Sequence, residues 1–132
     1  MDKTERVILT NICMISDGRG NVLVQDRRSH NWPGLTLPGG HVGIGEDFTQ
    51  AVIREVLEET GLTVSDPKLC GIKDWPMEDG SRYIALLYKA DTFDGTPRSS
   101  DEGEVFWMPL DKLPSAKLAD GTLELLDIFS KA

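Results

Sequence analysis

Apolar residues lie along the chain in short blocks, a pattern that predicts a mixture of strands and helices. The run from Val7 to Ile15 is apolar and rich in β-branched side chains, as is typical of a buried strand. Asp17–Asn21 has the composition of a tight turn, and Val22–Arg27 returns from it, so a β-hairpin is expected. Arg82–Ala90 has apolar residues at both odd and even positions, which predicts a central strand.

A helix with clear ends is predicted at Phe48–Thr60. Asp47 before it is a favourable N-cap, and Gly61 after it stands where a left-handed C-terminal cap belongs. Two further strands and a C-terminal amphipathic helix are expected at Lys68–Trp75, Val105–Leu110 and Asp120–Ser130. Strands mixed with helices in this order favour a mixed sheet packed between helices.

Three carboxylates gather on one side of the predicted central helix. At about 100° per residue, Glu58 lies roughly 60° to one side of Glu55 and Glu59 roughly 40° to the other. Like charges at this spacing repel each other, whereas a bound cation would reverse that cost. Mg²⁺ prefers such hard oxygen ligands and is commonly shared with substrate phosphates. From these residues alone, a solvated acidic face remains the alternative interpretation.

Gly40, Glu46 and the stretch Arg54–Leu62 have the residues and spacing of the Nudix box, and the chain resembles Nudix hydrolases over nearly its whole length. The resemblance implies an α/β (α+β) fold, an α/β/α sandwich with the mixed sheet between helices, as one domain over residues 1–132. It also implies Mg²⁺-dependent hydrolysis of a phosphoanhydride bond, with Mn²⁺ as a substitute.

The resemblance assigns roles to the residues of the box. The expected metal ligands are the carboxylates of Glu55, Glu58 and Glu59 and the carbonyl of Gly39. Glu46 and Arg54 are expected to orient these carboxylates, a layer that commonly governs how a metal site works.

A further acidic residue is expected from the loop before the last strand. Glu102 is predicted to join the metal site, with Glu104 as the rival because the loop alignment leaves both open. By resemblance, the general base is Glu55 in part of the family and a downstream glutamate in another part, so both assignments remain open.

Substrate contacts are predicted outside the acidic cluster. By resemblance, Arg27 at a strand end faces the phosphates, and Asp120 before the last helix lies where a purine base is read. Gly40 allows close backbone approach to a ligand. The aromatic candidates for a base-binding slot are Trp32, Trp75, Tyr83 and Phe106.

The chain is similar to MutT-like 8-oxo-dGTP diphosphatases, which predicts a nucleoside triphosphate pyrophosphohydrolase that releases a nucleoside monophosphate and pyrophosphate. The alternative enzyme is a pyrophosphatase of ADP-ribose or another nucleoside diphosphate derivative; Pro76 lies one residue short of the position typical of that class. A hypothesis from a different class is a nucleotide-sensing domain without catalysis. Such domains typically lose box glutamates, and this chain keeps them all.

The composition of the chain limits the classes of molecule and the compartment that are expected for it. The net charge of −8 over 132 residues argues against binding long nucleic acid, while a small polyphosphate arriving with Mg²⁺ is compatible with it. No apolar run reaches the length of about 18 residues that a membrane span needs, and no secretory leader is expected. Cys13 and Cys70 are expected to be reduced, which favours a cytoplasmic protein. The resemblance leaves monomer and homodimer open.

Overall fold

The computed structural model describes residues 2–132, with a four-stranded mixed sheet at its centre. The strand order is β4-β1-β7-β6; β1 runs parallel to β7, and the other neighbours are antiparallel. The strands are β1 (Val7–Ile15), β4 (Gly39–His41), β6 (Lys68–Pro76) and β7 (Arg82–Ala90). β7 is therefore a central strand, as predicted.

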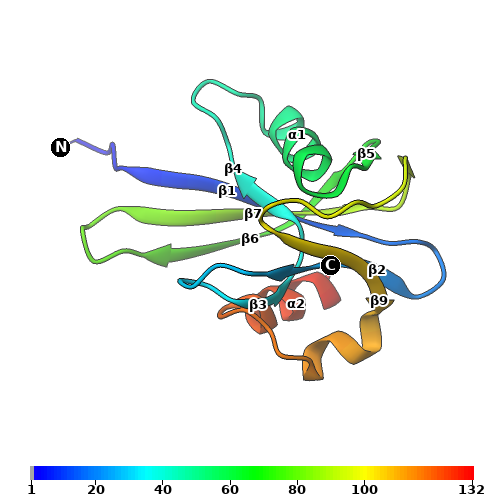
Figure 1. Cartoon of the computed structure of the whole chain (residues 1–132). Helices are drawn as coiled ribbons and strands as arrows, with labels where there is room; N and C mark the ends of the chain where they lie inside the picture. Colours follow the sequence, from blue (N-terminus) through cyan, green and yellow to red (C-terminus); the bar gives the residue numbers. More distant parts are fainter. Residues whose placement is uncertain (1) are drawn as a thin grey trace.

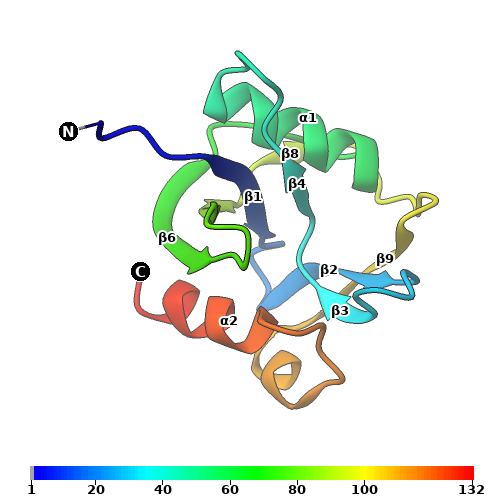
Figure 2. The same cartoon turned by 90° about the vertical axis from the view of Figure 1, so that its left-hand side faces the viewer.

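A smaller antiparallel sheet, in the order β3-β2-β9, lies beside the first (Figure 2). Its strands are β3 (Gly34–Thr36), β2 (Asn21–Arg27) and β9 (Gly103–Pro109), and a short pair is formed by β5 (Thr63–Val64) and β8 (Phe93–Asp94). The helices are α1 (Phe48–Thr60), the 3₁₀ helix η1 (Leu110–Ser115) and α2 (Thr122–Ser130). No helix of the described residues is long and apolar enough to cross a membrane.

The two α-helices cover opposite faces of the sheets, α1 above and α2 below in Figure 1. Alternation along each strand explains this arrangement, because successive side chains point to opposite faces. Cys13 and Leu86 pack in a buried cluster with α1, whereas their neighbours Met14 and Leu87 pack in a second cluster with α2. The expected α/β/α sandwich is confirmed.

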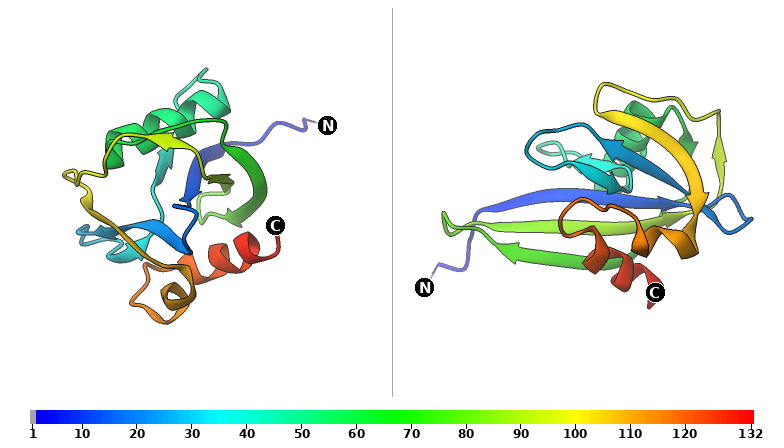
Figure 3. Two further views of the ribbon diagram at one scale, coloured as in Figure 1. Left: turned by 90° about the vertical axis from the view of Figure 1, so that its right-hand side faces the viewer. Right: turned by 60° about the horizontal axis from the view of Figure 1, so that its bottom comes forward.

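The expected hairpin of β1 with β2 is wrong. The turn between them does close, with the N–H of Asp17 bonded to the carbonyl of Asn21 at 3.1 Å and a single bridge between Ser16 and Val22. The two strands then separate into different sheets (Figure 3). Both edges of β1 are taken by β4 and β7, and both edges of β2 by β3 and β9. Their divergence leaves room for the cavity described below.

Helix α1 has the bounds and caps that the sequence predicts. The carboxylate of Asp47 accepts hydrogen bonds from the N–H groups of Thr49 at 2.9 Å and Gln50 at 3.1 Å. Gly61 adopts a left-handed φ of 78° and donates its N–H to the carbonyl of Leu57. Both ends of the helix that carries the acidic cluster are thus fixed by local interactions.

Removing the N-cap tests this account. Asp47→Ala leaves two N–H groups of the first turn without their acceptor, so the free energy of unfolding should fall by about 1 kcal/mol. Thermal and urea unfolding followed by circular dichroism would measure it. Glu78→Ala, in the exposed loop between β6 and β7, is the control and should change stability by less than about 0.5 kcal/mol. Equal effects of the two substitutions would contradict the capping role.

Candidate functional site

The first part of the site is formed by Gly39 and Gly40 of β4. These two residues without side chains lie between β1 and α1. A Cβ on Gly39 would overlap with the carbonyl of Asn11, and one on Gly40 would overlap with the carboxylate of Glu55. Gly39 donates its N–H to Oε1 of Glu59 at 2.9 Å. Glycine is therefore required here for close approach rather than for an unusual turn.

Arg54 holds three carboxylates with one guanidinium. Its Nε and Nη2 bond both oxygens of Glu46 at 2.7 and 2.9 Å, and its Nη1 reaches Glu55 at 3.0 Å and Glu58 at 3.1 Å. Glu46 also accepts the N–H of Gly43 at 2.8 Å. The bonds from Arg54 and Gly43 lower the pKa of Glu46 to about 2. The planar fork of arginine suits this arrangement, which the point charge of lysine would not reproduce.

Glu59 is the buried member of the cluster. It is 3% exposed and shares the inner face of α1 with Val52 and Val56, while Leu57 is 41% exposed. Its Oε2 is buried and has no hydrogen-bond partner within residues 2–132. Burial, reinforced by the neighbouring carboxylate of Glu102, raises the pKa of Glu59 to about 9. The carboxylate thus lacks a charge partner that would favour its ionised form.

The structure separates the two downstream candidates. Glu102 lies close enough to Glu59 to raise the pKa of that carboxylate, and it lines the same cavity as Glu55. Glu104 points elsewhere, with its carboxylate 3.4 Å from Arg28 in an exposed ion pair. The geometry therefore brings Glu102, and not Glu104, to the acidic cluster.

The residues suit a divalent cation by their chemistry. Burial raises the pKa of Glu55 as well as that of Glu59, and a cation beside them would reverse the cost of both charges. Oxygen donors of this kind are those that Mg²⁺ prefers. Within residues 2–132, no three His, Cys, Asp or Glu side chains are grouped closely enough to hold a metal ion as they stand, because Arg54 bonds Glu55 and Glu58.

A cavity of about 620 Å³ extends from the acidic cluster between the two sheets. Glu55 and Glu102 line it together with Trp75, Tyr83 and the start of α2. Trp75 and Tyr83 stack edge to face, with ring centroids 5.6 Å apart. The residues that line the cavity include Asn11, Gln25, Arg27, Trp32, Gly39, Gly40, Glu55, Trp75, Tyr83, Glu102, Asp120 and Glu124.

Arg27 and Asp120 both line this cavity, and Trp32 links them. The guanidinium of Arg27 lies 4.7 Å from the centre of the Trp32 ring, and its Nε donates to the carbonyl of Trp32 at 3.2 Å. The indole N–H of Trp32 donates to the carbonyl of Asp120 at 2.7 Å. Phe106 is 39% exposed on β9 and does not line the cavity.

Sequence reasoning missed several polar residues of this cavity, among them Asn11, Gln25 and Glu124. Asn11 and Gln25 come from the two diverging strands, and Glu124 from the first turn of α2. The available signal was a polar amide inside an apolar strand run, as in the segments Thr10-Asn11-Ile12 and Val24-Gln25. Such positions are usually apolar unless their polar group has a task.

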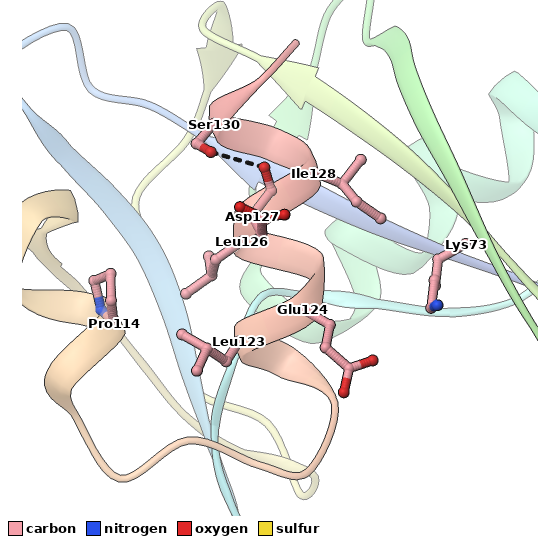
Figure 4. A pocket seen from close by; sticks show the side chains of 8 residues that line it. All are labelled: Lys73, Pro114, Leu123, Glu124, Leu126, Asp127, Ile128 and Ser130. Carbon is pink, nitrogen blue, oxygen red and sulfur yellow. Dashed lines mark hydrogen bonds between the residues drawn. The ribbon is translucent and has the colours of Figure 1, made fainter.

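A second hollow, of about 700 Å³, lies outside α2 (Figure 4). Ser130 there bonds the carbonyl of Asp127 at 2.7 Å within the helix itself. Apolar side chains of α2 and Pro114 form most of the remaining wall, with Lys73 at its border. The hollow holds no cluster of acidic side chains comparable with that of α1, so the inter-sheet cavity is the candidate active site.

Known proteins resemble this chain along most of its length. A family model described as NUDIX domain matches residues 7–128. An uncharacterized Nudix hydrolase of Bacillus subtilis, YvcI, is 30% identical over 128 residues, which cover 93% of this chain and 78% of that protein. The oxidized purine nucleoside triphosphate hydrolase of Danio rerio is 32% identical over 114 residues, covering 84% and 71%. A crystal structure of a MutT NUDIX hydrolase from Burkholderia pseudomallei has a TM-score of 0.79 at 29% identity, covering 93% and 98%.

The raised pKa of Glu59 predicts how stability depends on pH without divalent cations. Glu59 ionises near 4.5 when unfolded and near 9 when folded, so the folded state holds an extra proton between these values. This contribution is complete below about pH 4.5 and is lost as pH rises toward 9. Glu46 is ionised in both states over this interval, because its folded pKa is about 2.

Melting temperatures in EDTA at pH values from 5 to 9 would measure the effect. The wild type should become less stable as pH rises, and Glu59→Gln, which does not titrate, should show a flatter profile. The same slope in both proteins would show that the dependence comes from other groups.

Proposed function

The chain belongs to the Nudix family of hydrolases, and from this premise we propose that it is a Mg²⁺-dependent nucleoside triphosphate pyrophosphohydrolase. It would cleave the diphosphate linkage and release a nucleoside monophosphate and pyrophosphate. The observation that carries this proposal is that Glu55 of the acidic cluster and Glu102 line a cavity large enough for a nucleotide. Oxidised purine nucleotides such as 8-oxo-dGTP are the substrates proposed first, by similarity to the Danio rerio protein.

In this proposal Glu55, Glu58, Glu59, Glu102 and the carbonyl of Gly39 hold Mg²⁺, with Mn²⁺ as a substitute. When bound, the ion would neutralise charge on the phosphate oxygens and activate water. The buried Oε2 of Glu59 supports this assignment, because it is a ligand atom without a protein partner among the described residues. Arg54 and Glu46 would orient the carboxylates through the bonds described above.

The chain supplies two candidate proton acceptors for the attacking water. Burial raises the pKa of Glu55, which makes its carboxylate a better base near neutral pH. Glu102 lines the same cavity from the segment directly before β9. In this proposal Glu55 and Glu102 are both catalytic residues, because each would contact the water or the ion.

The part of the cavity beside Trp75 and Tyr83 would hold the nucleoside. Arg27 would contact the phosphates, and its stacking on Trp32 keeps the guanidinium at the cavity wall. Gly40 lines the cavity and would contact the ligand through its backbone, and Asp120 would read the base edge. We propose a small nucleotide as the partner of a cytoplasmic monomer or homodimer.

The matched pair Glu102 and Glu104 tests the downstream assignment. Glu102→Gln removes a charge from the acidic cluster and should lower kcat by about 10²- to 10⁴-fold. Glu104→Gln removes the same charge two residues away, from an exposed pair with Arg28, and should change kcat less than threefold. Steady-state pyrophosphate release with Mg²⁺ would measure both. A larger loss in the Glu104 variant would reverse the assignment.

A nucleotide panel tests the substrate class. Pyrophosphate and phosphate release would be measured with Mg²⁺ on 8-oxo-dGTP, the ordinary dNTPs and ADP-ribose. We expect the highest kcat/KM for an oxidised purine triphosphate, with pyrophosphate as product. Preferential cleavage of ADP-ribose would favour the diphosphate-derivative class instead, and binding without turnover of any compound would favour a sensor.

A further inference from the structure

Two side-chain amides are buried at the cavity wall without a partner for their nitrogen atoms. Asn11 and Gln25 are each 1% exposed, and both line the cavity. Nδ2 of Asn11 and Nε2 of Gln25 have no hydrogen-bond partner within residues 2–132. An unpaired buried donor is costly and rare in folded proteins, so a pair of them beside one cavity indicates a ligand-binding role.

The orientation of Asn11 follows from its neighbour. Its Oδ1 accepts the N–H of Gly40 at 3.2 Å, and only the oxygen end of the amide can accept that bond. The amino end is therefore the free end. Gly40 in turn lies directly against the carboxylate of Glu55, which places the amide of Asn11 beside the acidic cluster.

Gln25 flanks the same cluster from the other sheet. It lies two residues before Arg27 on β2, so the two side chains project from the same face of the strand. A Cβ on Gly103 would lie 3.3 Å from Cγ of Gln25, and Gly103 directly follows Glu102. In the pairing of β2 with β9, Arg27 lies opposite Gly103 and Gln25 opposite Val105, so Gln25 follows Arg27 along the same wall, away from Glu102.

We propose that Asn11 and Gln25 bind the polyphosphate chain of the substrate, donating hydrogen bonds from their amino groups to its oxygens. The assignment rests on the proposed function, since it concerns the same cavity. Asn11 bonds Gly40 beside the carboxylate of Glu55, and Gln25 shares a strand face with Arg27, so both amides lie close to residues proposed to hold Mg²⁺ and the phosphates. Donors of hydrogen bonds suit anionic oxygens, and an amide adds no charge that would compete with a cation for the glutamates.

Gln25 is the better residue for a test. Replacing Asn11 would also remove the acceptor of the Gly40 N–H, whereas Gln25→Met keeps a similar side-chain volume and removes only the amide. A buried polar group that serves ligand binding lowers the stability of the ligand-free protein, because it has no hydrogen-bond partner there. The melting temperature of ligand-free Gln25→Met should therefore rise by about 3 °C. Its Kd for Mg²⁺–tripolyphosphate should increase about tenfold in calorimetric titration.

Two further variants make the result specific. Gln25→Glu keeps the shape but replaces the amino donor by an acceptor, and should weaken tripolyphosphate binding at least tenfold. Leu86→Met is the matched control, because Leu86 is buried on β7 and packs with the α1 cluster without lining the cavity. Its Kd should equal that of the wild type.

Tripolyphosphate carries no base and its binding requires no turnover, so the two proposals fail separately. Nucleotide hydrolysis by the wild type together with an unchanged Kd in Gln25→Met would overturn the amide assignment alone. A lower melting temperature with unchanged Kd would show that the amide serves the fold, for instance through an internal water, and would also overturn it. Loss of tripolyphosphate binding in Gln25→Met without any nucleotide turnover by the wild type would support the amides and refute the proposed activity.

Discussion

The close approach of β4 to α1 is the constraint on which the site depends. Because Gly39 and Gly40 have no side chains, the carboxylates of Glu55 and Glu59 reach the strand backbone directly. The same strand is paired with β1, so the position of the acidic helix is tied to the central sheet. A larger residue at Gly40 would displace the carboxylate of Glu55, and one at Gly39 would overlap with the backbone of Asn11 on β1.

The carboxylates of the acidic cluster differ in how their negative charge is compensated. Arg54 forms ion pairs with Glu46, Glu55 and Glu58. These pairs explain why a cluster of like charges is compatible with a stable fold. Among the described residues, Glu59 on the inner face accepts a hydrogen bond only from the Gly39 N–H, and the nearby carboxylate of Glu102 raises its pKa further. The cost of its burial is the physical feature that a divalent cation would relieve, and it links the electrostatics of the fold to the proposed chemistry.

Much of the local structure could be predicted from the sequence. Helix α1 has its predicted bounds because Asp47 and Gly61 act within one turn of its ends, and the central strand β7 follows from its apolar residues on both faces. The hairpin of β1 and β2 could not be predicted correctly. A turn sequence determines that the chain reverses, whereas which strands pair depends on competition among distant edges.

The spacing of the box residues by itself determined the family resemblance and which side of α1 carries three carboxylates, because helical periodicity is a local property. Only the tertiary structure decided that Glu59 is buried while Glu58 is exposed, that Glu102 rather than Glu104 meets the cluster, and that Asn11 and Gln25 face one cavity. Burial and contact between segments far apart in the chain depend on how the sheets diverge and how the helix is rotated against them. No local pattern of residues encodes those distances.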